Sequence, residues 1–358
     1  MTRTASGPAS GPAAPMDASA VAALRRAVAP FEGSDDACAW RTVATSLPPF
    51  VALWGLMYAA RGLPYGVTLA LAVPAAGFLV RTFIVAHDCG HGAFFRAART
   101  NRWMGRLCAL PALVPFGWWR RMHAVHHATS GKLDHRGMDI ATLTVREYEA
   151  RTATARLGYR LLRHPVVLFG LAPALYFGVA MRLPWLAPAA WRRERRGILL
   201  TNAALALVVA LLVHAVGWRT FLRIQLPVSL LAWTVGMWLF FVQHQFEDTY
   251  WAHDGEWEQG RASLAGASHL DLPPLLAWFT GYIGLHHVHH LSPRVPSYRL
   301  AACVAAVPAL RDGPRLALGA ALGTWRHALW DEGGRRLVGF AEAAARDQAH
   351  SPTGMRKR

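Results

Sequence analysis

The chain has 358 residues, of which 53% are hydrophobic and 16% are charged, and its formal net charge is +17. Soluble domains are usually about 25% charged, so this composition favours a membrane protein over a set of soluble domains. The apolar character excludes a nucleic-acid-binding module as the reason for the positive charge, whereas basic loops beside apolar spans are typical of membrane proteins.

The N-terminal part predicts a tail followed by a membrane hairpin. Residues 1–44 are rich in Ala, Gly, Pro and Ser and lack the basic start, apolar core and cleavage site of a signal peptide. We interpret them as a flexible cytoplasmic tail with one helix near residues 20–28. Residues 45–60 and 67–86 are mostly apolar and approach the ~20 residues that a spanning helix needs, and a short turn containing Gly and Pro joins them.

A second hairpin is predicted further along the chain. Residues 199–216 and 221–242 are apolar and are separated by a tight turn. The shorter apolar segment 166–181 lies between two basic regions, and the second of these, residues 191–196, contains four arginines. A single crossing would place the two basic regions on opposite sides, so we interpret 166–181 as a re-entrant or interfacial segment.

These assignments predict an all-α integral membrane fold. Four transmembrane helices in two hairpins place both termini, the arginine block and every histidine cluster on the cytoplasmic side of a bacterial inner membrane. The expected parts are the tail 1–44, a membrane domain 45–310 that includes a cytoplasmic helical cap, and cytoplasmic C-terminal helices with a basic tail at 311–358.

Histidine carries the strongest chemical signal in the sequence. The chain has 17 histidines, and nine of them form tight clusters at 87–91, 123–127 and 286–290. Spacings of three and four residues place side chains on one face of a helix, so each cluster directs its imidazoles toward a common site. In the third cluster His287 is rotated about 100° from that face, and a helical frame that begins at His287 is the alternative.

The clusters predict a metal site with many nitrogen ligands. His244, near the end of the fourth span, adds an imidazole, although a lone histidine is often only a hydrogen-bonded side chain. Imidazole alone does not name the metal, but zinc usually takes four ligands, so a larger set favours two irons that activate dioxygen. Four scattered cysteines exclude a disulfide framework or a cysteine-ligated site. The predicted ligands are His87, His91, His123, His126, His127, His244, His286, His289 and His290.

Other polar residues have weaker signals. Asp88, Glu247 and His287 are candidates to orient the ligand imidazoles, with a surface charge as the alternative for Asp88. No Glu-x-x-His pair of the soluble di-iron bundles occurs beside the clusters, which favours an all-imidazole site. We interpret the remaining histidines as solvated or hydrogen-bonded side chains: His135, His164, His214, His253, His269, His327 and His350.

The three clusters resemble the histidine boxes of the membrane fatty acid desaturase family. The likeness covers roughly residues 50–310, and the sequence looks most similar to bacterial acyl-lipid desaturases of the Δ12/ω6 type. It rests on longer strings around the boxes, at 123–134, 139–145, 242–251 and 278–293.

The resemblance implies two Fe ions held by the nine histidines, dioxygen as co-substrate and an acyl chain of a membrane lipid as substrate. It also implies an external electron donor of the ferredoxin or flavodoxin type, because the chain has no His-Pro-Gly-Gly motif of a cytochrome b5-like domain. The basic cytoplasmic face suits either an acidic donor or anionic lipid. The segment 134–139 departs from the usual loop after the second box, so regioselectivity does not follow from the resemblance.

Other functions remain open on the sequence alone. The same scaffold suits an acyl hydroxylase, an alkane hydroxylase or a carotenoid ketolase, and the strings 242–251 and 278–293 favour a desaturase over these. A metal transporter or storage protein would place polar residues along a path through the membrane, whereas the spans hold few charges. A lipid-binding structural protein leaves the histidines unexplained. We interpret the nearby aromatic residues as core or lipid-facing rather than substrate-lining: Trp118, Trp119, Trp238, Phe240 and Phe279.

Overall fold

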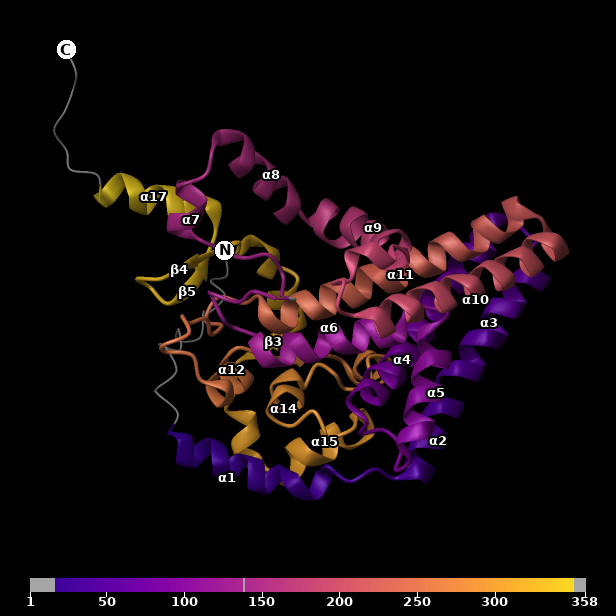
Figure 1. Ribbon diagram of the computed structural model, residues 1–358, viewed down its shortest axis with the longest axis horizontal. Helices are drawn as coiled ribbons and strands as arrows, with labels where there is room; N and C mark the ends of the chain where they lie inside the picture. Colours follow the sequence, from indigo (N-terminus) through magenta and orange to yellow (C-terminus); the bar gives the residue numbers. More distant parts are fainter. Residues whose placement is uncertain (1–16, 138, 351–358) are drawn as a thin grey trace, which may run out of the picture.

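The computed structural model describes residues 17–137 and 139–350, most of which are helical (Figure 1). The N-terminal helices are α1 (Ala18–Val28), α2 (Asp36–Ala44), α3 (Leu47–Ala59), α4 (Tyr65–His91), α5 (Ala98–Ala109) and α6 (Phe116–Thr129). The central helices are α7 (Val145–Glu149), α8 (Ala153–Arg163), α9 (Ala172–Gly178), α10 (Arg192–Val216) and α11 (Trp218–His244). The C-terminal helices are α12 (Gln259–Ala265), α13 (Pro274–Phe279), α14 (His286–Leu291), α15 (Ser297–Ala306), α16 (Leu318–Ala321) and α17 (Phe340–His350).

In the described part of the chain, four helical segments are long and apolar enough to cross a membrane: Asp36–Ala59, Tyr65–His91, Arg192–Val216 and Trp218–His244. They coincide with the four apolar segments found in the sequence. Each is longer than its apolar part, because a polar stretch at one end continues the same helix. Three of these polar ends carry the histidines of α4 and α11 and the arginines of α10.

The short apolar segment before α10 forms a bent structure. Helix α8 and the segment Val167–Arg182 meet at an angle of 65° and count as a fifth span only if the bent pair is taken as one. A π-helical turn, Val167–Leu171, precedes α9. Thr234 of α11 donates a hydrogen bond of 2.7 Å to the Phe169 carbonyl in this turn. The bend therefore keeps α9 beside α11.

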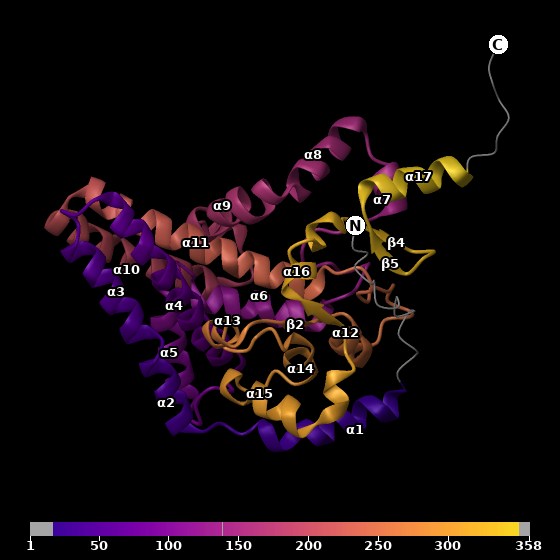
Figure 2. The same ribbon diagram turned by 180° about the vertical axis from the view of Figure 1, so that it is seen from behind.

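The long helices and the short elements gather at opposite ends of the molecule. Helices α3, α4, α10 and α11 extend together toward one end, whereas α12, α14, α15 and the strands lie at the other (Figures 1 and 2). Helix α4 packs against α3, α5 and α11, and α10 packs against α6 and α11. The main apolar core lies between these helices and includes Leu79, Phe241 and Val242. The polar ends of α4, α6 and α11 thus meet the short helices.

The described residues include five short strands, which depart from the all-α prediction. They form a sheet of β1 (Leu143–Thr144), β4 (Leu329–Asp331) and β5 (Arg336–Val338) and a pair of β2 (His269–Asp271) and β3 (Arg315–Ala317). The pair β4–β5 is antiparallel, and the pairs β1–β4 and β2–β3 are parallel. Strands of two or three residues carry no detectable alternation of apolar and polar residues, so the sequence pattern could not reveal them.

The terminal regions contain more structure than one helix and a tail. The segment interpreted as an N-terminal tail holds both α1 and α2, and Val28 of α1 is fully buried in a cluster with Ile283 and Leu300. The C-terminal part expected to be helical contains β3, β4 and β5 as well as α16 and α17. Residues 1–16 and 351–358 of the expected tails lie outside the described residues.

Candidate metal centre

Four helices bring the histidine clusters together at one place. His87 and His91 occupy the last turns of α4, which ends at Gly92 with a φ of +72°, the left-handed conformation that glycine adopts readily. Helix α6 carries the second cluster, α11 ends at His244, and the short helix α14 consists largely of the third cluster. Because each helix contributes side chains from one face, the imidazoles converge.

The first set of imidazoles, called group A, consists of His87, His91, His123 and His289. One ring nitrogen from each lies within 4.8 Å of the others. The Nε2 atoms of His91 and His123 are 3.0 Å apart. The His87 ring centroid lies 4.5 Å from that of His289. Group A thus joins α4, α6 and α14.

The second set, called group B, consists of His126, His244, His286 and His290, and all four are buried. The Nε2 atom of His244 lies 3.2 Å from that of His126 and 3.0 Å from that of His286. The Nε2 atoms of His286 and His290 are 3.1 Å apart. Group B joins α6, α11 and α14.

His127 lies between the two groups. Its Nε2 atom is 3.1 Å from that of His123 and 3.0 Å from that of His289, both in group A. Its ring stacks on that of His290 in group B, with centroids 4.2 Å apart. The structure therefore brings all nine histidines singled out in the sequence into one continuous cluster.

Three of these imidazoles are held by an acceptor at the opposite ring nitrogen. His126 donates from Nδ1 to Asp139 at 2.6 Å, and His87 donates from Nδ1 to Asp88 at 2.9 Å. His244 donates from Nδ1 to the Gly266 carbonyl at 3.0 Å. A proton on Nδ1 leaves the Nε2 lone pair free and directed into the cluster, which is how proteins prepare imidazole for a metal.

Burial keeps several of the clustered imidazoles uncharged. It holds the pKa of several rings well below its ordinary value, and repulsion among neighbouring imidazolium charges lowers the pKa further. This applies outside the apolar helices to His123, His127, His286, His289 and His290. A neutral imidazole is the form that binds a metal ion.

The spacing of the nitrogens fits metal ions. Two nitrogen ligands about 2.1 Å from a metal and at right angles to each other lie about 3.0 Å apart. The Nε2 pairs His91–His123 and His244–His286 are each separated by 3.0 Å. Uncharged lone pairs that face one another at this distance without a shared proton would repel, and a cation between them removes that conflict. Groups A and B are thus two neighbouring places suited to a metal ion.

The other residues singled out in the sequence lie in different surroundings. The second oxygen of Asp88 accepts a 2.6 Å hydrogen bond from the Ser297 backbone, so this buried carboxylate joins α4 to α15. Glu247 forms an ion pair with Arg336 near β5. His287 donates from Nε2 to the Leu310 carbonyl at 2.8 Å and stacks on His269, and burial lowers its pKa to about 4.

Sequence reasoning missed Asp139, the residue that holds His126. It lies in the loop after α6, twelve residues beyond His127, where no helical spacing connects it to a cluster. That loop begins at Gly131, whose φ is +76° and where a Cβ atom would lie 2.8 Å from the Tyr250 carbonyl oxygen. Its position in the string after the second cluster was the only signal. Among the described residues, groups A and B contain only histidines from the set singled out in the sequence.

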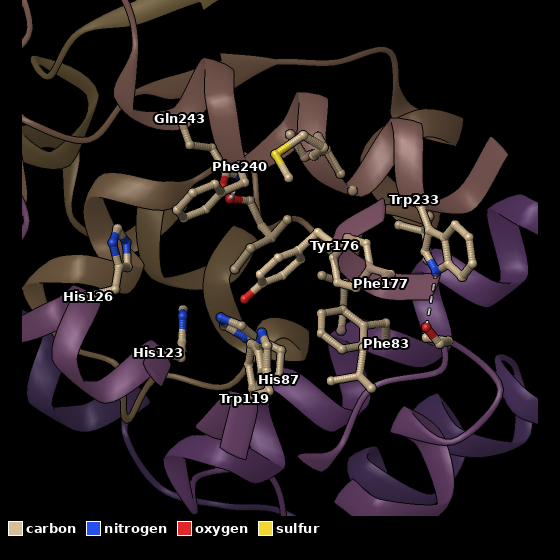
Figure 3. Close-up of a pocket in the computed structure, with 18 of the residues that line it drawn as sticks. Phe83, His87, Trp119, His123, His126, Tyr176, Phe177, Trp233, Phe240 and Gln243 are labelled. Carbon is tan, nitrogen blue, oxygen red and sulfur yellow. Dashed lines mark hydrogen bonds between the residues drawn. The ribbon is translucent and has the colours of Figure 1, made fainter. Parts of the chain in front are cut away.

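An apolar cavity of about 360 Å³ opens onto both groups (Figure 3). His87 and His123 of group A and His126 and His286 of group B line one end. The wall on α11 continues to Trp233, whose Nε1 donates to the Ala112 carbonyl at 3.1 Å. Ten residues separate Trp233 from Gln243, the last wall residue of α11, which is about 15 Å of helix.

Aromatic rings form much of this wall. Tyr176 and Phe177 enter from the bent segment, Phe83 from α4 and Phe240 from α11 (Figure 3). Trp119 also lines the cavity and stacks on His123 with centroids 4.7 Å apart. Trp119 and Phe240 thus line the cavity, which the sequence interpretation did not favour, although Trp119 also packs against the main core as expected.

The other three aromatic residues singled out in the sequence do not line this cavity, and two of them, Trp118 and Trp238, pack in the main core. Trp118 is buried, Trp238 packs against the main core, and Phe279 meets Phe78 edge-on at 5.0 Å. Spacing could not separate Trp118 from Trp119, because neighbouring positions on a helix point in directions about 100° apart. Only the packing of α6 decides which ring faces the cavity.

Comparison with known proteins finds similarity to proteins that are described as desaturases. A family model described as fatty acid desaturase matches residues 62–319, a range that contains groups A and B. A fatty acid desaturase of Bacillus subtilis is 43% identical over 293 residues, which make up 82% of this chain and 83% of that protein. An sn-1 oleoyl-lipid 12-desaturase of Picosynechococcus is 27% identical over 272 residues, 75% of this chain and 76% of that protein. An sn-1 acyl-lipid omega-3 desaturase (ferredoxin) of Synechocystis is 28% identical over 232 residues, 61% of each chain.

Proposed function

This chain belongs to the fatty acid desaturase family, and from that premise we propose that it desaturates an acyl chain of a membrane lipid with two iron ions and dioxygen. The single observation that carries the proposal is the apolar cavity that ends at imidazoles of both groups. As a desaturase the protein is an oxidoreductase. We propose a Δ12/ω6-like double bond, because one relative is named for a 12-desaturase.

The reaction removes two hydrogens from neighbouring methylene carbons. With two electrons and two protons from outside, dioxygen is reduced to two waters while the acyl chain gains a cis double bond. Iron supplies the oxidising power that this requires, because the C–H bond of an acyl methylene is not acidic and no side chain can remove its hydrogen as a base. The nine histidines would hold the two irons, in groups A and B with His127 between them.

The protein's own residues position the substrate and exclude water. Phe83, Tyr176, Phe177 and Phe240 surround the acyl chain along the cavity, and Trp233 stands at the end remote from the histidines. Such a wall offers little to a charged or polar group but accepts methylenes. The carbons that lie beside His87 and His126 are then those that react, so the depth of the cavity sets the position of the double bond.

The charge distribution supports a cytoplasmic site. We propose that the four long helices form two membrane hairpins, with both termini and a cap of short helices in the cytoplasm of a bacterial cell. The first five residues of α10 include Arg192, Arg193, Arg195 and Arg196, and arginines flanking a span favour the cytoplasmic side. On that side an acidic ferredoxin or flavodoxin would deliver the electrons, and the net charge of +17 favours its approach.

Expression in a bacterial host followed by gas chromatography–mass spectrometry of total fatty acids tests the function. A new unsaturated acid, with its double bond mapped by derivatisation, is expected in cells with the native chain and not in cells with His126→Ala. Elemental analysis of the purified protein is expected to find about two irons per chain and little zinc.

Two other outcomes would change the proposal. A hydroxylated acid in place of an unsaturated one would leave the metal centre intact and identify a hydroxylase. An unchanged fatty acid profile, in cells that hold iron-loaded protein and a working donor, would contradict an acyl-lipid substrate.

A further inference from the structure

A second and larger cavity, of about 1130 Å³, lies between α5, α6 and α10. We call it the arginine groove. One glutamate, Glu194, also lines it and pairs with Arg121 at 3.3 Å. The other basic side chains of the groove are Arg102, Arg106, Arg120, Arg192, Arg193 and Arg196.

Apart from Arg121, the arginines that line this groove have no acidic partner among the described residues. Within the described part of the chain, no ion pair or hydrogen bond is formed by the side chains of Arg102, Arg120, Arg192, Arg193 and Arg196, which are all exposed. Two of them, Arg192 and Arg193, stand in the first turn of α10, and Arg196 begins the second turn. A helix N-terminus carries a partial positive charge, so cations there are unfavourable unless an anion is close. The arrangement therefore favours a bound anion.

The remaining wall of the groove is apolar. Trp103 and Leu107 of α5 are 61% and 51% exposed, and Leu200 of α10 is 72% exposed. Leu200 belongs to a helix that is apolar enough to span the membrane, so this wall lies at the depth of the lipid. The arginines at the membrane surface suit the phosphate of a phospholipid headgroup, and the apolar side chains at membrane depth suit its acyl chains.

The arginine groove adjoins the cavity of the metal centre. Val114, in the turn between α5 and α6, lines both. Its side chain is nearly fully buried, so it forms the partition between them. A lipid with its phosphate among the arginines therefore has an acyl chain beside the place where the reaction cavity begins.

We propose that the arginine groove binds the headgroup phosphate of an anionic glycerophospholipid, one of whose acyl chains enters the reaction cavity past Val114. This inference rests on the proposed function and assigns its acyl carrier. An acidic electron donor is the other anion that arginines attract. The apolar wall and its membrane depth favour lipid, because a soluble donor does not reach side chains such as Leu200.

The test measures lipid preference and does not need activity. The purified chain is placed in phosphatidylcholine bilayers, and electron spin resonance compares the motionally restricted fraction of spin-labelled phosphatidylglycerol with that of spin-labelled phosphatidylcholine. We expect a preference for phosphatidylglycerol that falls at least about tenfold in Arg192→Gln/Arg193→Gln/Arg196→Gln. The matched control is Arg25→Gln/Arg26→Gln/Arg311→Gln, which removes three exposed arginines outside the groove and is expected to keep the preference.

The outcomes separate the occupants. An unchanged preference in the groove variant, or an equal loss in both variants, would overturn the proposal. A groove variant that keeps its lipid preference but no longer binds an acidic ferredoxin would assign the arginines to the donor. Full displacement of the label by millimolar inorganic phosphate would reduce the groove to a free anion site and overturn the acyl part.

A second variant tests the connection between the two cavities. Val114→Trp fills the partition and is expected to abolish the unsaturated product while the phosphatidylglycerol preference stays. Desaturation that continues in this variant would contradict the path past Val114. Because lipid preference is measured without iron, donor or turnover, a failure of the headgroup site is distinguishable from a failure of the desaturase function.

Discussion

Groups A and B both take histidines from α6 and α14, but different parts of the chain complete and support each group. On α6, His123 belongs to A and His126 to B, and on α14 the neighbours His289 and His290 belong to A and B. The rest of group A comes from α4, whereas the rest of group B includes the end of α11. Two members of group A are half-buried, and all of group B is buried.

The supports of the two groups also differ in kind. The acceptor in group A, Asp88, is the residue next to its histidine on α4 and is fixed by the Ser297 backbone. The acceptors in group B, Asp139 and the Gly266 carbonyl, come from loops. Group A thus depends on a helix end, and group B depends on the loop after α6 and on Gly266, the residue that caps α12. Changes in loops should therefore disturb group B first.

The largest effect on desaturation and iron content is expected when a single histidine of group A or of group B is replaced by alanine. His289→Ala and His290→Ala alter adjacent residues of the same helix, so their structural consequences match closely. We expect each to lower desaturation more than about 100-fold and to reduce iron from about two to about one per chain, because each leaves the other group complete. Iron analysis and fatty acid profiles are the measurements.

The same pair of variants tests whether the groups are separate. Loss of both irons in His289→Ala or in His290→Ala would show that the groups bind metal as one unit, with His127 as the link. Retention of two irons would contradict the assignment of that histidine as a ligand. Asn replacing the exposed His164 provides a histidine-removal control that should leave iron unchanged.

A smaller effect is expected from the two orienting carboxylates. Asp139→Asn keeps the shape but weakens the acceptor for His126, and we expect metal affinity or activity to fall about 10- to 100-fold. Asp88→Asn should cause a similar loss and also lower the Tm, because Asp88 in addition anchors Ser297. Metal titration together with thermal unfolding separates the two. Equal Tm values for both variants would contradict the structural role given to Asp88.

The sequence predicted which histidines form the site, but it did not predict which of them belong to group A and which to group B. Spacing of three and four residues identified eight of the nine histidines and favoured leaving out His287, because helical geometry acts within one helix. His244 stands alone in the sequence and was singled out only by its position at the end of an apolar span. Spacing could not tell that His289 and His290 separate into different groups, since that depends on how α14 sits against α4 and α11. Asp139 and Gly266 could not be found for the same reason, because loops carry no periodic signal.

The overall fold shows the same limit. Apolar length located the four long helices, since twenty apolar residues are a local property of the chain. The short strands, the bend between α8 and α9 and the choice of Trp119 over Trp118 for the cavity wall all depend on contacts distant in sequence. Local pattern therefore predicted which segments are helices, and packing determined what faces the substrate.

Unlike the substitutions above, acid should destabilise the metal-free protein through groups A and B alike. The pKa of His289 in group A and of His290 in group B is lowered by burial. An unfolded chain binds protons near pH 6.5, whereas these folded imidazoles stay neutral. The free energy of unfolding of metal-free protein should thus fall as pH drops below about 6.5. Thermal unfolding between pH 7 and pH 5 should show a lower Tm at acid pH, and a flat profile would contradict neutral buried histidines.

The smallest effect concerns His253, which clamps the loop that carries Asp139. Its ring lies 2.8 Å from Asp134 and 3.2 Å from Glu332, and these bonds raise the pKa of His253. A raised folded pKa gives stability that is complete below the unfolded pKa and is lost as pH rises through the folded value. Because the side chain is 53% exposed, water screens the pairs and the contribution stays below about 1 kcal/mol.

This clamp should act on group B alone. As pH rises above neutrality, the loop loosens, and the iron held with His126 should dissociate sooner than the iron of group A. In His253→Gln, retention of the group B iron should differ less between pH 6 and pH 8.5 than in the native protein. In the control His164→Gln, the difference between the two pH values should be the same as in the native protein. Chelator-competition kinetics at the two pH values measure this. If His253→Gln changed the release of both irons equally, the loop would support the whole cluster, and the contrast between a helix-held group A and a loop-held group B would fail.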